Sequence, residues 1–565
     1  MSTTLASAPA PAAAPAPADP TAHPSRRAAA LWLGAAFCVS LLLSVQLFRY
    51  GDEWWHIALG RLILQSGIPP AEPFSFVHTQ HPWVEQQWLY EVALAALVRI
   101  GGDGLASLAL GLVGSAALLL AALSVPRAAR FSRGWSAFAL LLGGLMAGMA
   151  LGVRGETVSA LGVAATLLII RRWRDGAERW VWLLPPMFLV WANLHAGFIA
   201  GIGVLGFTLL IHRPDGRLRG RTAWPGATFV AVVGIGFGAA ALAAGLAVGA
   251  AVLVLLWALL RPEPLEPGTR RRPLLLASLL AAALTLVNPA GPGIYGYIAE
   301  TVGNPILSQF VSEWQSPNFH DTLTRLIEVV AALLPLLWML SRRVRIPDAL
   351  LAATFFLLTL QAVRNVSLFA VVAIPQLAEY GSAAWARHAP RSLRLHLRTP
   401  RPGWLAVVAA VAVSAAAIAD VAPELTPAAA ARFESTHEPA AAATYVAAHF
   451  PNQRLLSSDA DAGYLAYRFP RGRVVFVYDE IGIFGVGPLT NYLDIADLGP
   501  HWRSLINRYG IRHAILGATS PDTSALLELG WTVNCYDGPS GRVVMSAGGS
   551  PPTSAPPSPT AAPAC

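Results

Sequence analysis

The feature that most constrains this chain is its succession of long apolar runs separated by short arginine clusters. Hydrophobic residues make up 55% of the 565 residues and charged residues 13%, and the mean hydropathy is +0.51. A water-soluble fold needs more polar surface, so the composition predicts an α-helical polytopic membrane protein. The net charge of +8 comes from arginines between the apolar runs. Such arginines are typical of cytoplasmic loops, and they give no reason to expect nucleic acid as a partner.

The arginine clusters also predict the topology. If all of them face the cytoplasm, neighbouring clusters must be joined by an even number of crossings. The apolar runs then give about thirteen crossings, with a cytoplasmic N-terminus and an extracytoplasmic C-terminal domain. The apolar part of 83–100 is too short to cross, so we expect it to be interfacial or re-entrant. The expected spans are 28–48, 105–123, 134–153, 157–170, 180–211 (two spans, broken at 193–197), 227–260 (two spans), 274–287, 326–340, 349–360, 366–377 and 405–418.

Changes in composition divide the chain into parts. Residues 1–25 are rich in Ala and Pro, and 549–565 in Pro, Ser and Ala, so both are predicted to be disordered tails. The membrane domain takes 26–421 and includes a long outer loop at 49–83. In 432–548 strand-like and helix-like segments alternate, which predicts a small α/β domain outside the membrane. Its predicted strands are 455–458, 474–477, 513–516 and 542–545. The three cysteines predict neither a disulfide framework nor a zinc site.

Every polar interruption of the apolar runs falls on the extracytoplasmic side of this topology. Ionisable groups at the edge of a membrane are costly, so each interruption is a candidate functional segment. Their common side predicts one shared cavity that opens away from the cytoplasm. The interruptions are GDEWWH (51–56), RGE (154–156), NLHAG (193–197), NPAG (288–291), EWQSP (313–317) and QAVRN (361–365).

The first outer loop places two carboxylates and a histidine, Asp52, Glu53 and His56, directly after the first apolar run. The stretch HIALGRLILQSG has helical spacing and is expected to lie on the membrane surface as an amphipathic helix. Prolines then turn the chain, and HPWVEQQWLYE returns it to the bilayer. The loop tryptophans suit a membrane interface, where anchoring is their simplest role. They are Trp54, Trp55, Trp83 and Trp88.

A carboxylate pair after the first span, a surface helix and a Pro/Trp-rich return resemble the polytopic GT-C glycosyltransferases, which use polyprenyl-phosphate-linked sugars. Five longer strings look closer still to a bacterial branch of uncharacterised GT-C-like membrane proteins. The resemblance covers most of 28–380 and the shape of the tail domain. The strings are GDEWWHIALGRLILQSGIPPAEPFSFVHTQHPWVEQQWLYEV, WANLHAGF, VNPAGPGIYGY, SEWQSP and AVRNVSLFAVVAIP.

This resemblance implies a GT-C-like fold and transfer of a sugar from a polyprenyl-phosphate carrier to an envelope glycan or protein. It also implies a location in the bacterial inner (plasma) membrane. The family's catalytic carboxylate after the first span matches Asp52 or Glu53, and the sequence does not choose between them. The chosen carboxylate would take the proton of the acceptor hydroxyl, and the other could hold a divalent metal ion through its oxygens.

A lipid phosphate that leaves the sugar gains negative charge in the transition state, so fixed cations should face it. Arg154 and Arg364 lie at the outer ends of expected spans, and guanidinium groups suit phosphate. An ion pair with Glu156 is the alternative role for Arg154.

Other polar residues are weaker candidates. His56, Glu85 and His195 are possible substrate-binding residues, although His195 could instead tighten a helical hairpin. The simplest roles for the remaining groups are a solvated loop for Glu313, Asp479 and Glu480, and a helix cap for Asn365.

Two other classes of protein stay open at this point. A transporter of lipid-linked solutes would place charged sites near the midplane in broken helices, often within repeated halves. Here the polar breaks lie at one face, and no internal repeat is evident. A non-catalytic scaffold would keep the fold and bind envelope glycans through its tail domain.

Overall fold

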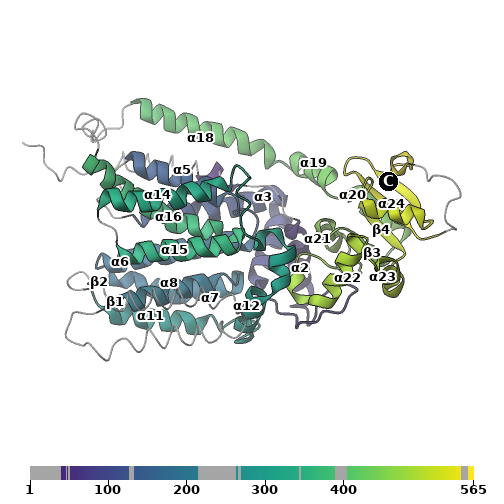
Figure 1. Cartoon of the computed structure of the whole chain (residues 1–565), viewed down its shortest axis with the longest axis horizontal. Coiled ribbons are helices and arrows are strands. Elements are labelled where there is room, and N and C mark those ends of the chain that lie inside the picture. Colours follow the sequence, from purple (N-terminus) through teal and green to yellow (C-terminus); the bar gives the residue numbers. More distant parts are fainter. Residues whose placement is uncertain are drawn as a thin grey trace, which may run out of the picture.

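The computed structural model describes most of the helical core and the tail domain. In it a long helical bundle carries a smaller domain at one end (Figure 1). The expected span 227–260, the predicted tail 1–25 and most of the expected span 28–48 lie outside the described residues. The described residues are 38, 40–42, 44–45, 48, 51–125, 133–213, 263–264, 269–342, 345–388, 404–548 and 558–565.

Helices occupy the described segments for which the apolar runs predicted them. The break at 193–197 is also found, between α7 and α8. The long elements are α3 (Trp88–Leu123), α5 (Arg133–Ala147), α6 (Gly155–Arg174), α7 (Leu184–Leu194), α8 (Phe198–Ile211), α11 (Arg271–Leu284), α14 (Arg325–Ser341), α15 (Ile346–Gln361), α16 (Val366–His388) and α18 (Trp404–Glu424). The short ones are η1 (Glu178–Leu183), β1 (His212–Arg213), β2 (Glu263–Pro264), α12 (Gly293–Gly303), α13 (Pro305–Phe310), η2 (Ser312–Trp314) and η3 (Val363–Asn365).

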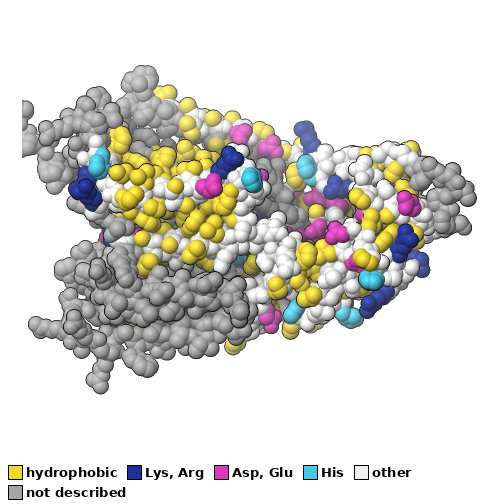
Figure 2. Space-filling view, in the orientation of Figure 1, with side chains coloured by type: hydrophobic (Ala, Val, Ile, Leu, Met, Phe, Trp, Pro, Cys, Tyr) yellow, Lys and Arg dark blue, Asp and Glu magenta, His cyan; other side chains and the backbone are white. Residues whose placement is uncertain are grey.

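The bundle has the surface of a membrane protein. Among the described residues, Trp88–Leu123 and Val363–His388 are long and apolar enough to cross a bilayer, and the pair Val411–Glu424 and Pro427–His437, bent by 60°, makes up to a third. Hydrophobic side chains cover much of the bundle in Figure 2, as expected against lipid. The number of thirteen crossings and the orientation of the ends stay predictions. Exposed apolar residues on the bundle include Leu276, Leu279, Leu336, Met339 and Leu357.

Helix α3 consists of two helical parts. Gly101 and Gly102 interrupt it with non-helical backbone angles, and Gly102 has φ +68°, a conformation that favours glycine. Helix α3 packs on both α2 (Asp52–Ser66) and α6. A Cβ on Gly60 of α2 would lie 2.1 Å from the carbonyl oxygen of Glu91, so α2 needs a glycine there to approach α3.

Helix α2 is not the amphipathic surface helix that the sequence predicted. It lies between α3 and α21 (Asp459–Arg468) of the outer domain (Figure 1). Most of its side chains are buried. Trp54 and Trp55 are 2% and 3% exposed. The indole N–H of Trp54 donates to Glu438 at 2.9 Å, and the ring of Trp55 lies 5.4 Å from that of Tyr478. These two tryptophans therefore fill the join between two parts of the protein instead of anchoring a loop to lipid.

The outer domain is built on a mixed sheet with strand order β3-β4-β6-β5, in which only β3 and β4 are parallel. The predicted strands at 455, 513 and 542 are found. The predicted strand 474–477 is not part of this sheet, and β5, with its polar Thr, Asn and Asp, was not predicted. The elements are α19 (Pro427–His437), α20 (Ala440–His449), β3 (Leu455–Leu456), α21, η4 (Ile481–Ile483), α22 (Val486–Ala496), α23 (Trp502–Tyr509), β4 (His513–Gly517), α24 (Pro521–Glu528), β5 (Thr532–Asp537), β6 (Arg542–Ser546) and η5 (Pro559–Ala561).

The first outer loop runs along the outer domain. Ser75 forms an isolated parallel bridge with Val475, and its hydroxyl donates to the carbonyl of Phe476 at 2.6 Å. The backbone N–H groups of Gln80 and His81 both lie 3.1 Å from the carbonyl oxygen of Ile483. Buried side chains of α2, this loop and the outer domain form one hydrophobic core. The predicted boundary between 26–421 and 432–548 therefore separates two segments of the chain, but side chains from both segments contribute to one hydrophobic core.

Residues 558–565 differ from the disordered tail that the sequence predicted. Cys565 forms a disulfide with Cys535 of β5, and the backbone N–H of Tyr536 donates to the carbonyl of Pro563 at 2.8 Å. Because three cysteines at wide spacing do not reveal a pairing, only the tertiary structure brings the two thiols together.

Candidate active site

Two arginines and three carboxylates form an ion-pair cluster at the end of the bundle that meets the outer domain. The guanidinium of Arg154 lies 3.2 Å from a carboxylate oxygen of Asp52 and 3.6 Å from one of Glu156, and it also contacts Glu313. The guanidinium of Arg364 contacts Glu156 and lies 2.9 Å from an oxygen of Glu313. Four of the predicted polar interruptions thus meet at one place, and the ion pair expected for Arg154 is one of several that it makes.

The local structure explains why charged groups gather there. Asp52 begins α2 directly after Gly51, whose φ of +80° requires the left-handed conformation that glycine adopts readily. Glu156 lies in the first turn of α6, where the partial positive charge of a helix N-terminus favours an anion. Arg364 lies in η3 between α15 and α16. Helix ends leave backbone groups unpaired, so the ends of several helices create one polar region.

Asp52 and Glu53 differ in access. The Asp52 side chain is 20% exposed, whereas Glu53 is fully buried within α2. A carboxylate that takes a proton from a bound molecule must reach that molecule. Asp52 is therefore the more accessible of the two carboxylates.

The outer domain adds two carboxylates to this region. Asp479 forms a side-chain hydrogen bond with Asp52, and the hydroxyl of Tyr297 donates to Glu480 at 2.7 Å. Burial raises the pKa of Asp52 to about 6, although the charge of Arg154 opposes this. Burial and the neighbouring Asp52 raise the pKa of Asp479 well above its usual range. Two carboxyl groups in contact favour one shared proton. The sequence predicted that Asp479 and Glu480 lie in a solvated loop. That prediction was wrong, because Asp479 interacts with Asp52 and Glu480 accepts from Tyr297.

A second polar group lies in the core between α2 and α3. The Nδ1 of His56 is 3.1 Å from Glu91, and the side-chain amide of Gln87 is 3.4 Å from the same nitrogen. Glu85 accepts a hydrogen bond from the backbone N–H of Gln87 at 3.2 Å. His56 and Glu85 are each 6% exposed. The printed contacts of His56 and Glu85 thus lie outside the ion-pair cluster, and substrate binding by these residues stays a prediction.

His195 belongs to both a hairpin and the ion-pair cluster. Its Nδ1 lies 2.7 Å from the hydroxyl of Ser159 and accepts from the backbone N–H of Gly197 at 3.1 Å. Its Nε2 lies 3.8 Å from Glu156. Asn365 does not cap α16 as expected, because its amide donates to the carbonyl of Leu358 at the end of α15, at 3.0 Å.

The sequence left open a divalent metal ion at Asp52 or Glu53, and this stays a prediction. Within the described ranges, no group of three or more His, Cys, Asp or Glu side chains could hold a metal ion. Asp52 and Glu313 direct oxygens at guanidinium groups, which already supply positive charge. The chemistry available here is therefore that of a carboxylate beside fixed arginine cations.

No family profile and no curated protein matches the chain. Its fold is similar to that of an oligosaccharyltransferase from Archaeoglobus fulgidus. In the structure tethered to an acceptor peptide with an NVT sequon, identity is 14%, coverage is 87% of this chain and 69% of that chain, and the TM-score is 0.49. The same enzyme, AglB, has also been solved with an inhibitory peptide and a dolichol-phosphate. For that complex the identity is 13%, the alignment covers 87% of this chain and 69% of that chain, and the TM-score is 0.48.

A second neighbour is ArnT from Cupriavidus metallidurans bound to undecaprenyl phosphate. Its identity to this chain is 17%, the alignment covers 92% of this chain and 98% of that chain, and the TM-score is 0.41. The complexes of these two neighbours contain a dolichol-phosphate and undecaprenyl phosphate, respectively. Because these TM-scores are all below 0.5, the reaction is inferred from this chain's own residues.

Proposed function

We propose that the protein is a membrane glycosyltransferase that moves a sugar from a polyprenyl-phosphate carrier to an envelope glycan or protein on the extracytoplasmic face. The observation that carries this proposal is the contact at 3.2 Å between Asp52, the accessible carboxylate of α2, and Arg154. Arg364 lies in the same ion-pair cluster. A base beside fixed cations is what the displacement of a phosphate by a hydroxyl requires.

In the proposed reaction the acceptor oxygen attacks the anomeric carbon of the sugar. The bond from that carbon to the phosphate oxygen breaks, and its electron pair leaves with the phosphate. The proton of the acceptor hydroxyl passes to Asp52. Because burial raises the pKa of Asp52 to about 6, this carboxylate is ionised at neutral pH and is a stronger base than an exposed aspartate.

The arginines can serve the phosphate only if a carboxylate gives way. Glu313 is the best candidate, because it lies on the three-residue segment η2 and contacts both Arg154 and Arg364. Asp52 and Glu156 instead lie in the first turns of α2 and α6. We infer that phosphate oxygens take the position of the Glu313 carboxylate, since guanidinium groups bind either anion in the same geometry.

The proposal includes about thirteen crossings of a bacterial plasma membrane, with the outer domain outside the cytoplasm. The hydrophobic surface of the bundle supports membrane insertion. The disulfide between Cys535 and Cys565 supports an oxidising compartment for the outer domain. The phosphate-facing ion-pair cluster then lies at the outer surface, where a membrane-embedded carrier presents its head group.

The proposal is tested by mass analysis of envelope glycans from cells that express the wild-type chain, D52N or no protein. The D52N strain should lose the same glycan as the deletion strain at normal protein level, because removal of a general base costs about a hundredfold to ten-thousandfold in rate. E528Q, which changes an exposed carboxylate of the outer domain, is the matched control and should leave the glycan intact. An unchanged glycan profile in the D52N strain would contradict the enzyme and favour a scaffold.

A further inference from the structure

Three arginines of the outer domain lie away from the ion-pair cluster. Arg454 directly precedes β3, Arg508 is in the last turn of α23, and Arg512 directly precedes β4. All three are exposed. Figure 2 shows basic side chains gathered at the end of the outer domain, where Figure 1 draws α23 and β4. We call these three residues the outer arginine cluster.

The backbone brings the three arginines to one turn. Gly510, with φ +64°, ends α23 and leads the chain toward β4, so Arg508 and Arg512 lie on either side of it. The guanidinium of Arg454 reaches the same turn and donates to the carbonyl of Tyr509 at 2.5 Å. A cation from β3 therefore lies beside two others that are close in sequence.

The sheet register adds to this concentration of charge. Strands β3 and β4 are parallel, with Leu455 opposite His513. Arg454 and Arg512 each precede one member of that pair and are neighbours across the two strands. Like charges at neighbouring positions of a sheet are destabilising, and an anion between them would remove this cost.

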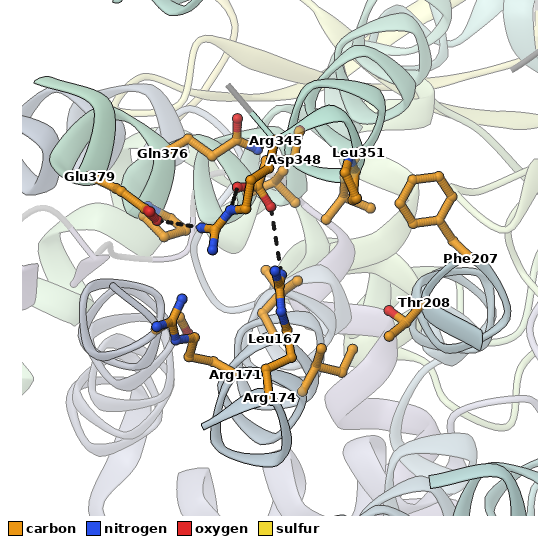
Figure 3. Close-up of a pocket in the computed structure, with 15 residues that line it drawn as sticks. Leu167, Arg171, Arg174, Phe207, Thr208, Arg345, Asp348, Leu351, Gln376 and Glu379 are labelled. Carbon is orange, nitrogen blue, oxygen red and sulfur yellow. Dashed lines mark hydrogen bonds and ion pairs between the residues drawn. The ribbon is translucent and has the colours of Figure 1, made fainter. Parts of the chain in front are cut away.

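Carboxylates of the protein do not balance the outer arginine cluster. In the pocket of Figure 3, by comparison, Arg345 lies 2.9 Å from Asp348 and 2.7 Å from Glu379. Among the described residues, no carboxylate oxygen lies within 4.0 Å of a guanidinium nitrogen of the outer arginine cluster. Exposed charge of one sign attracts a polyanion over long range.

Aromatic rings border the arginines. The guanidinium carbon of Arg454 lies 5.4 Å from the ring centre of Phe76 in the first outer loop, and the ring of Phe450 stacks on His513 at 4.2 Å. Phe76, Phe450 and Tyr509 are all partly exposed. Sugar rings pack their C–H faces on aromatic rings, while guanidinium groups pair with carboxylates or phosphates. This combination fits a charged glycan better than a free anion.

The position of the cluster also favours a glycan. In Figure 1, α23 and β4 are on the side of the outer domain away from the bundle, so they do not face the bilayer that the bundle would cross. The chain from Arg454 to Ala460 spans at most about 21 Å. A Cβ on Gly51, the residue before Asp52, would lie 3.2 Å from the carbonyl oxygen of Ala460. A glycan of several sugars held at the cluster can therefore extend to Asp52.

We propose that the outer arginine cluster binds an anionic polysaccharide of the cell envelope and so holds the acceptor of the transfer reaction. The role as acceptor rests on the proposed function, whereas the binding does not. Carboxylates or phosphates of the polymer pair with Arg508 and Arg512, and its sugar rings contact Phe76 and Phe450. Attachment at the cluster raises the effective concentration of the acceptor end near Asp52.

The test measures binding of glycans to the purified full-length protein in phosphatidylcholine nanodiscs. The probes are an oligogalacturonate, which carries one carboxylate per sugar, and a neutral dextran of the same length. The oligogalacturonate should bind and lose affinity as the salt concentration rises, whereas dextran should not bind. Arg508→Gln/Arg512→Gln should lower the affinity about tenfold or more. Arg325→Gln/Arg432→Gln, which removes two exposed arginines elsewhere, is the matched control and should keep full affinity.

Three results would overturn the proposal. Equal affinity of the wild-type protein and the Arg508/Arg512 variant would place the polymer elsewhere. Equal affinity for dextran would exclude recognition of negative charge. Stronger binding of phosphatidylglycerol vesicles than of the oligogalacturonate, lost in the same variant, would assign the cluster to a lipid surface. If the double variant does not fold, Arg508→Gln and Arg512→Gln are measured singly, and wild-type affinity in both would also contradict the proposal.

D52N separates this proposal from the proposed reaction. Asp52 is outside the outer arginine cluster, so D52N should bind the oligogalacturonate as tightly as the wild-type protein does. Normal envelope glycans in the D52N strain, with this binding intact, would contradict the reaction alone. Loss of the glycan in the D52N strain, with no binding of the oligogalacturonate by the wild-type protein, would contradict the polysaccharide site alone.

Discussion

At the scale of single residues, the charge of Asp52 determines how the proposed reaction depends on pH. Burial raises its pKa to about 6, and only the ionised carboxylate can accept a proton. We therefore expect the transfer rate to be constant above about pH 7 and to fall about tenfold per pH unit below pH 6. The measurement is the rate of sugar transfer between pH 4.5 and 8. A rate that rises as the pH falls through 6 would rule out Asp52 as the base.

Asp479 should tune this profile through its hydrogen bond with Asp52. Because its own pKa is raised, Asp479 is the protonated partner, and its O–H stabilises the ionised Asp52 and lowers the pKa of that group. D479A removes the donor, so we expect the acidic limb of the rate profile to move to higher pH. D479N keeps an N–H donor and should move it less. Equal shifts in the two variants would show that Asp479 acts only by packing.

Glu313 should compete with the carrier phosphate for the two arginines. E313Q removes the competing charge, so we expect the KM for the carrier to fall severalfold, while R364Q should raise it by about tenfold. The readout is the KM for the polyprenyl-phosphate sugar at saturating acceptor. E328Q, at an exposed position in the first turn of α14, is the control for a lost carboxylate. A higher KM in E313Q would mean that Glu313 binds the substrate directly instead of standing in for its phosphate.

At the scale of elements, the sequence predicts what depends on local patterns. The apolar runs predicted α5, α6, α14 and α16, because the hydropathy of a helix in a membrane bundle is a property of its own residues. The burial of α2 could not be predicted in this way. Trp54 reaches Glu438 across 384 positions of sequence, and no local signal reports so distant a partner. Strand β5 was missed for a related reason, since its polar residues give a weak strand signal and it is stabilised by pairing with β6.

The candidate site shows the same limit. Arg154, Arg364 and one of the acidic pair were predicted because each interrupts an apolar run, and such interruptions are costly. Their mutual contacts, and the arrival of Asp479 from the outer domain, depend on how loops meet in space. Asp479 follows a segment that looks like a strand and is instead held by the outer loop through Val475. Charge and hydropathy therefore predicted members of the ion-pair cluster, while our proposal of Asp52 over Glu53 depends on the packing of α2.

The approach of α21 to α2 gives a prediction for this join. A Cβ on Gly463 would lie 2.6 Å from the carbonyl oxygen of Gly51, so G463A must push α21 away from the N-terminus of α2. We expect a lower Tm and a reduced rate of transfer, because Asp52 begins this helix. G482A is the matched control in the same domain, since a Cβ there would meet nothing within 4 Å. Wild-type activity and Tm in G463A would show that the join tolerates a wider spacing.

At the scale of the whole molecule, the helical bundle and the outer domain are joined by shared packing and backbone hydrogen bonds. The first outer loop pairs with 475–483, and a common hydrophobic core extends from α2 to the sheet. An outer domain fixed in this way holds Asp479 against Asp52, which a domain on a flexible linker could not do. The ion-pair cluster lies at the end of the bundle that meets the outer domain, so the proposed orientation places both outside the cytoplasm.

The disulfide of the outer domain provides a test of this orientation. Cys535 and Cys565 are bonded and Cys38 is free among the cysteines, and a bond of this kind persists in an oxidising compartment. When cells are denatured in a maleimide reagent without reductant, the protein should therefore carry one label. After reduction it should carry three labels. The number of labels is read from the shift on a gel. C565S should carry two labels without reductant, because Cys535 loses its partner. Three labels on the unreduced wild-type chain would place the outer domain in the reducing cytoplasm, and a phosphate-carrier reaction on the extracytoplasmic face would then be excluded.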